Sequence, residues 1–133
     1  MELKDVTYTY SPGTVHEVNA IEKVNVTIDK GEFIGIIGHT GSGKSTLIQH
    51  FNGLMKPTSG QVLYAGEDIW KDGYNLKNLR SNVGLVFQYP EHQLFEIDVL
   101  TDVCFGPKNL GFSNAEAKEK AREALLQVGV KED

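Results

Sequence analysis

One glycine-rich stretch constrains this chain more than any other. Residues 33–46 read FIGIIGHTGSGKST, an apolar run that passes into a loop of small residues and ends in Lys-Ser-Thr. The four fixed positions of the G-x-x-x-x-G-K-[ST] pattern are present, namely Gly38, Gly43, Lys44 and Ser45. This pattern needs a strand before the loop and a helix after it. We therefore predict a strand over residues 33–37, buried on both faces, and a helix that begins near Lys44.

The residue types of the loop suit a triphosphate. Gly41 and Gly43 have no Cβ, so backbone N–H groups can surround anionic oxygens closely. The N-terminus of the following helix adds unpaired N–H groups and partial positive charge. Lys44 can reach the β- and γ-phosphates, and Ser45 offers a hydroxyl oxygen to Mg²⁺. The predicted contacts of the loop are Gly38, Gly41, Ser42, Gly43, Lys44, Ser45 and Thr46; the alternative is a chance match to the pattern.

Strands and one short helix are predicted around the loop. Val6, Tyr8 and Tyr10 alternate with threonines, and a second alternating run covers residues 24–28. These two runs predict an antiparallel pair of strands, and residues 61–64 predict a third, short strand. After the loop, apolar residues recur at helical spacing, and glycine and proline then end the helix: Leu47, Ile48, Phe51, Leu54, Gly53 and Pro57.

The second half begins with another apolar run. Residues 83–87 predict a second buried strand that ends at Gln88, and Pro90 excludes a regular strand beyond it. Ser113 and Glu116 match a capping box, which predicts the start of a helix. Its apolar face consists of Ala117, Ala121, Ala124, Leu125 and Val128, and Gly129 would end it.

Composition narrows the function classes. The net charge of −5 over 133 residues argues against a general nucleic-acid-binding surface, which would be basic. Cys104 is the only cysteine and is predicted to be a small buried apolar residue. No apolar run approaches the roughly 20 residues of a membrane helix. Any membrane association would therefore have to come through a partner.

Three features together carry a family resemblance. Tyr10 lies upstream of the loop, the loop lies in the middle, and Gln88 follows the second apolar run. This arrangement resembles the first half of an ATP-binding-cassette ATPase. The resemblance implies that Tyr10 stacks on adenine and that Gln88 helps to bind Mg²⁺ and senses the γ-phosphate. It also implies catalytic roles for Lys44 and Gln88, a metal site at Ser45 and Gln88, and ATP and Mg²⁺ as cofactors.

Longer phrases point to one branch of that family. Residues 85–95 read LVFQYPEHQLF, residues 102–109 read DVCFGPKN, and residues 6–14 read VTYTYSPGT. These phrases look like the energy-coupling-factor branch, which powers bacterial vitamin and metal-ion uptake. The resemblance implies a second ATP-binding subunit, a transmembrane coupling subunit and a substrate-binding membrane subunit as partners. It implies no nucleic-acid partner and a peripheral place at the cytoplasmic face of the cell membrane.

The resemblance also implies a domain map. The fold class is α/β, a partial phosphate-loop NTPase core with an N-terminal antiparallel β subdomain and the start of a helical subdomain. We expect residues 1–133 to be the N-terminal part of a single ATP-binding-cassette domain. Residues 1–32 and about 61–70 would form the β part, 33–60 and 81–88 the nucleotide-binding core, and 89–133 the start of the helical subdomain.

Several alternatives stay open at this point. No L-S-G-G-Q signature and no apolar strand ending in Asp-Glu is found in the sequence, so we expect negligible ATP hydrolysis by this chain alone. Another phosphate-loop NTPase or kinase, or an inactive fragment, is the alternative reading. Tyr10 could simply pack on a sheet, with Tyr8 as its competitor for the adenine. His39 and His92 are interpreted as surface residues.

Overall fold

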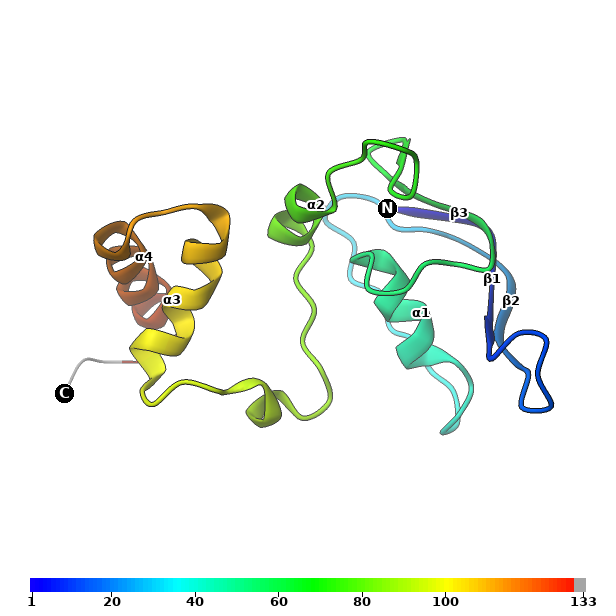
Figure 1. Ribbon diagram of the computed structural model, residues 1–133, viewed down its shortest axis with the longest axis horizontal. Coiled ribbons are helices and arrows are strands. Elements are labelled where there is room, and N and C mark those ends of the chain that lie inside the picture. Colours follow the sequence, from blue (N-terminus) through cyan, green and yellow to red (C-terminus); the bar gives the residue numbers. More distant parts are fainter. Residues whose placement is uncertain (131–133) are drawn as a thin grey trace. The chain divides into compact units, whose positions relative to one another are not determined.

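The N-terminal part of the chain is built on an antiparallel sheet. The computed structural model describes residues 1–130, and the strand order of its sheet is β2-β1-β3-β4 (Figure 1). The strands are β1 (Glu2–Tyr10), β2 (Val18–Thr27), β3 (Ser59–Tyr64) and β4 (Glu67–Asp68). β1 pairs antiparallel with both β2 and β3. The predicted antiparallel pair and the third strand are confirmed, although β1 and β2 begin earlier than the alternation suggested.

Apolar residues of β1, β2 and β3 form a core together with residues from two short helices and from the segment after β4. The buried cluster comprises Leu3, Val6, Ile21, Val62, Ile69 and Leu79. Helix α1 (Lys44–Phe51) packs Leu47 and Phe51 against it, and α2 (Leu76–Asn82) contributes Leu79. The predicted helix after the loop is confirmed, but it ends at Phe51, so Leu54 lies beyond it and is exposed.

A basic side chain joins the two helices. Arg80 of α2 donates from Nη2 to the carbonyl oxygen of Gly53 at 2.7 Å and from Nε to that of Asn52 at 3.4 Å. These carbonyl groups follow the C-terminus of α1, where a helix leaves its carbonyl groups without internal partners and carries partial negative charge. Arg80 therefore anchors this end of α1 to α2.

The prediction of two strands buried on both faces is wrong. Residues 33–37 and 83–87 form no strand. The side chains of Phe33 and Ile37 are 100% and 98% exposed, and that of Val86 is 80% exposed. Strands buried on both faces take their backbone hydrogen bonds from neighbours on either side. Every strand among residues 1–130 belongs to the antiparallel sheet, and none pairs with these two runs.

A second compact unit begins at Val86 and is mainly helical. It contains a 3₁₀ turn, η1 (Pro90–Gln93), followed by α3 (Val99–Leu110) and α4 (Asn114–Gln127). The two helices pack around Cys104, Ala117 and Ala121, which confirms Cys104 as a buried apolar residue. The last three residues of the helical part predicted over 89–133 lie outside the described residues. Within the described part, no helix is both long and apolar enough to span a bilayer.

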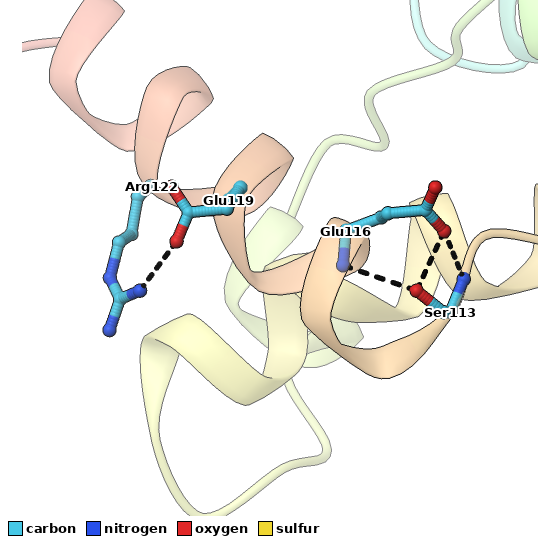
Figure 2. A network of polar contacts seen from close by, with 4 residues as sticks. All are labelled: Ser113, Glu116, Glu119 and Arg122. Atoms are coloured by element: carbon cyan, nitrogen blue, oxygen red, sulfur yellow. Dashed lines mark hydrogen bonds and ion pairs between the residues drawn. The ribbon is translucent and has the colours of Figure 1, made fainter.

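The predicted capping box is present at the start of α4. Ser113 Oγ accepts a hydrogen bond from the backbone N–H of Glu116 at 3.4 Å, and the Glu116 carboxylate accepts from the Ser113 N–H at 2.8 Å (Figure 2). Ala117 and Ala121 of the predicted apolar face are buried, and Leu125 is half-buried. The prediction is wrong for Ala124 and Val128, which are exposed, because nothing in the described helical unit covers the last turn of α4. Gly129 follows the helix with φ of 83°.

Candidate functional site

The glycine-rich loop turns sharply and leads directly into α1. Ser42 N–H donates to the carbonyl oxygen of His39 at 3.2 Å, and Gly41 and Gly43 have φ of 82° and 85°. The first N–H groups of a helix have no partner within it, and the first helical bond here runs from Leu47 N–H to Gly43 O at 2.8 Å. The N–H groups of Lys44 and the two residues after it therefore face the loop side of α1. This arrangement is suited to bind an anion.

Close packing against β2 explains why Gly43 must be glycine. A Cβ at Gly43 would collide with the carbonyl oxygen of Ala20 and lie 2.9 Å from Ile21 Cγ2. A Cβ at Gly38 would lie 2.6 Å from Ser42 Oγ, whereas one at Gly41 would meet no atom within 4 Å. The loop therefore packs tightly against the sheet at Gly43 and is open at Gly41.

Lys44 folds its charged end back over the loop. Its Nζ donates to the carbonyl oxygens of Gly38 and His39, both at 2.7 Å, and to Ser42 Oγ at 3.4 Å. The loop thus holds one full positive charge beside the positive end of α1. Both features attract phosphate oxygens, and carbonyl oxygens are acceptors that the ammonium group can exchange for stronger, charged ones.

The two hydroxyl groups after Lys44 have different surroundings. Ser45 is exposed, whereas Thr46 is 7% exposed and its Oγ1 lies 3.1 Å from the hydroxyl oxygen of Tyr10. Ser45 is therefore the hydroxyl open to a cation. Among residues 1–130 there is no group of three or more His, Cys, Asp or Glu side chains that could hold a metal. These residues fit Mg²⁺ that keeps mostly water and phosphate ligands, with one protein hydroxyl.

Tyr10 lies beside the first turn of α1, whereas Tyr8 packs against the core of the sheet. Tyr10 ends β1, is 39% exposed and touches the first turn of α1 through Thr46. Tyr8 is half-buried, with ring centroids 4.9 Å from Tyr10 and 5.3 Å from His50, both edge to face. Tyr10 therefore offers ring surface beside the loop, while Tyr8 packs in the interior.

Sequence reasoning missed His50, which is fully buried in α1. Its Nδ1 donates to the carbonyl oxygen of Thr46 at 2.7 Å, and its Nε2 is buried without a partner among the described residues. Burial lowers the pKa of His50, and the bond to Thr46 opposes this shift. Residues four apart share a helix face, so the position of His50 relative to Thr46 was the signal that could have found it.

Gln88 lies in the second compact unit and is exposed. It lines an open hollow of about 410 Å³ together with Phe87, Tyr89, His92 and Gln93. The rings of Tyr89 and His92 are 5.6 Å apart there. The hollow shows that Gln88 is accessible to a ligand, and its role toward Mg²⁺ stays a prediction.

Comparison with known proteins identifies relatives across the whole chain. The sequence pattern of the ABC transporter family matches residues 21–133. The energy-coupling factor transporter ATP-binding protein EcfA2 of Bacillus licheniformis is 53% identical over 133 residues, 98% of this chain and 46% of that protein. EcfA2 of Clostridium acetobutylicum is 50% identical over 130 residues, again 98% of this chain and 46% of that protein. The chain thus spans about half the length of the curated relatives it matches.

Solved structures agree with the sequence relatives. CbiO1 from Clostridium perfringens, described as part of the ABC transporter complex CbiONQ, has a TM-score of 0.77 and 37% identity, covering 98% of this chain and 50% of that one. A dimeric ATP-binding cassette in a post-hydrolysis state, bound to ADP and Pi, has a TM-score of 0.82 and 32% identity, covering 98% and 58%. The predicted fold class is confirmed, and this chain belongs to the ABC transporter family.

Proposed function

We propose that this chain is the N-terminal part of the ATP-binding subunit of an energy-coupling-factor-type importer. The intact protein would couple Mg–ATP binding and hydrolysis to the uptake of a vitamin or metal ion. The observation that carries the proposal is the loop itself, with Lys44 Nζ folded over it at the N-terminus of α1 and Tyr10 beside it. The EcfA2 relatives, about 50% identical over nearly the whole chain, support the branch.

The proposed roles divide among a few residues. Lys44 would bind the β- and γ-phosphates, with the loop N–H groups around them, and Tyr10 would stack on the adenine. Ser45 and Gln88 would hold Mg²⁺, which neutralises the charge of the phosphates when bound. Residues 1–133 would then be parts of one ATP-binding-cassette domain, with the β part, nucleotide core and helical part in the predicted ranges.

The proposed partners are a second ATP-binding subunit, a transmembrane coupling subunit and a substrate-binding membrane subunit. The names of the relatives support this, because EcfA2 is a transporter ATP-binding protein and CbiO1 is part of a transporter complex. The dimeric ATP-binding cassette supports a second ATP-binding subunit. The protein would be peripheral, at the cytoplasmic face of the cell membrane, without a nucleic-acid partner.

We propose further that the 133-residue chain alone hydrolyses ATP negligibly. Phosphoryl transfer to water needs a residue that orients the attacking water. The sequence contains no apolar strand ending in Asp-Glu that would provide one. Turnover by this chain above that of its Lys44→Ala variant would contradict this part of the proposal.

Replacement of Lys44 tests the phosphate site directly. Lys44→Ala removes a charged donor, so the ATP affinity of the 133-residue chain should fall by about 10- to 100-fold, measured by titration calorimetry with Mg–ATP. Lys71→Ala is the matched control, because Lys71 forms only an exposed ion pair with Glu67 at 3.3 Å. Equal ATP affinities for the two variants would overturn the proposed site.

Comparison of ATP with GTP separates this proposal from a GTPase. Stacking on Tyr10 accepts any base with a flat ring, so it discriminates weakly between bases. A GTPase reads guanine through hydrogen bonds, which discriminate strongly when they are lost. The ATP and GTP affinities of the chain should therefore lie within about tenfold of each other. A strong preference for GTP would favour the GTPase.

A further inference from the structure

Four side chains join β1 to the first turns of α1 in a closed circuit of contacts. We refer to Tyr8, Tyr10, Thr46 and His50 as the β1–α1 cluster. The hydroxyl groups of Tyr10 and Thr46 are 3.1 Å apart, and the Thr46 carbonyl accepts from His50 Nδ1 at 2.7 Å. The ring of Tyr8 contacts the rings of both His50 and Tyr10, which closes the circuit.

Chemistry fixes the direction of the bond between His50 and Thr46. A carbonyl oxygen can only accept, so His50 carries a proton on Nδ1. The lowered pKa keeps the ring neutral near pH 7, which leaves Nε2 unprotonated. Thr46 is buried with both its hydroxyl and its carbonyl engaged within the cluster. Its hydroxyl therefore contacts Tyr10, and its carbonyl oxygen contacts His50, so Thr46 links the two side chains.

Tyr10 is the member of the cluster that reaches solvent. Tyr10 is 39% exposed, while one edge-to-face contact with Tyr8 and one hydroxyl contact with Thr46 restrain its ring. A ring restrained from two directions loses little further freedom when a ligand stacks on it. The restraint comes from α1, the helix whose N-terminus forms the loop.

We propose that the β1–α1 cluster is a positioning device for the nucleobase. Thr46 acts as a positioning residue that holds Tyr10 at a fixed place relative to the phosphate loop, with Tyr8 and His50 supporting both. The device favours ligands that carry a flat ring and a polyphosphate together over inorganic polyphosphate alone. This inference rests on the proposed nucleotide-binding function and adds to it the contact that holds the base-stacking ring in place.

The decisive variant is Tyr10→Phe, which keeps the ring and removes only the hydroxyl. The test compares the affinities of the full 133-residue chain for Mg–ATP and for inorganic tripolyphosphate, which has the phosphates without a base. The ratio of the two affinities should fall by about three- to tenfold in favour of tripolyphosphate, because Tyr10 is no longer pre-ordered. Tyr74→Phe, which removes a hydroxyl elsewhere on the same unit, is the matched control and should keep the ratio.

Thr46 provides the second arm of the test. Thr46→Val keeps the shape and removes the hydroxyl, so it should lower the same ratio by a similar factor, and Thr46→Ser should restore it. The double variant of Tyr10→Phe and Thr46→Val should lower the ratio no further than either single change, because both remove one bond. Thermal unfolding of each variant shows whether it is folded. If Thr46→Val does not fold, the affinity ratio of Tyr10→Phe alone decides the test.

The outcomes separate this inference from the proposed function. Loss of both ligands in Lys44→Ala together with an unchanged ratio in Tyr10→Phe would support the phosphate site and overturn the positioning device. Additive effects in the double variant would overturn it as well. A ratio that falls in Tyr10→Phe and Thr46→Val alike and returns in Thr46→Ser supports it.

Discussion

Two glycines of the loop share a left-handed backbone and differ in their surroundings. A Cβ at Gly43 would collide with Ala20, whereas a Cβ at Gly41 would meet open space. Both changes to alanine force a left-handed residue, which costs about 1–2 kcal/mol. Gly43→Ala should add about 1–3 kcal/mol for the collision. Urea unfolding of the two variants measures the difference, and equal losses would show that Gly43 is not pressed against β2.

His50 predicts that stability depends on pH. Burial lowers the pKa of His50 in the folded chain below the ordinary histidine value of 6.5. Between these two pKa values the unfolded chain binds the proton and the folded chain does not, so the free energy of unfolding should decrease as pH falls through 6.5. The loss should stop once pH falls below the folded pKa.

Replacement of His50 tests whether this residue causes the pH dependence of stability. The His50→Gln variant has no imidazole to titrate. As pH falls below 7, its free energy of unfolding should therefore decrease less than that of the unsubstituted chain, measured by chemical denaturation at each pH. His16→Gln is the control, because His16 is exposed. A pH dependence that is unchanged in His50→Gln would assign it to other groups.

The sequence predicted which residues form the loop, but not how two of them are used. The pattern placed Lys44, Ser45 and Thr46 at the phosphates by their spacing, and these contacts stay predictions. What the pattern did not predict is that the Thr46 hydroxyl lies 3.1 Å from that of Tyr10. That contact joins residues 36 positions apart, and no local spacing rule reaches across such a distance.

At the scale of elements, α4 offers a clean test of local stabilisation. Ser113 accepts from the N–H of Glu116, and an N-cap serine changed to alanine costs about 1 kcal/mol. Ser113→Ala should therefore lower the stability of the helical unit by about that amount. Glu119→Ala removes only the exposed ion pair with Arg122 and should change stability by less than about 0.5 kcal/mol (Figure 2). Thermal unfolding of the two variants measures the two losses of stability. Equal losses would contradict a stabilising role of the Ser113 cap.

The same cap has a pH dependence. Hydrogen bonds from the Ser113 side chain and backbone lower the pKa of Glu116. A lowered carboxyl pKa contributes stability above the ordinary value, and this contribution is lost as pH falls through the lowered pKa. Ser113→Ala removes the side-chain donor and keeps the backbone N–H, so it should reduce this acid-dependent part of the stability, measured by chemical denaturation at each pH.

Elements were predictable where their cause is local. The capping box and the N-terminus of α1 depend on residues within one turn, and both are present. The strands predicted at 33–37 and 83–87 depend on partners elsewhere, because a buried strand is held by its neighbours. Their apolar composition was read correctly, and the absence of pairing within residues 1–130 decides their structure.

For the whole molecule, the exposed apolar runs predict self-association. Phe33 and Ile37 are almost fully exposed within one short segment, and clustered apolar surface promotes association. The 133-residue chain should sediment faster as its concentration rises, and Ile37→Lys should weaken this. Val15→Lys should weaken it less, because Val15 is 95% exposed but lies in a turn outside these runs. A monomer at all concentrations would contradict the prediction.

Helix α1 is fastened at both of its ends. Its first turn is tied to β1 through Thr46 and Tyr10, and the residues after its last turn are tied to α2 through Arg80. We therefore expect α1 to stay in place when the proposed phosphate ligand draws Lys44 Nζ away from the carbonyl oxygens of Gly38 and His39. The backbone change that accompanies this exchange should fall within residues 38–43, because Gly41 and Gly43 there have positive φ. That segment would then act as the hinge, and α1 as the frame against which it moves.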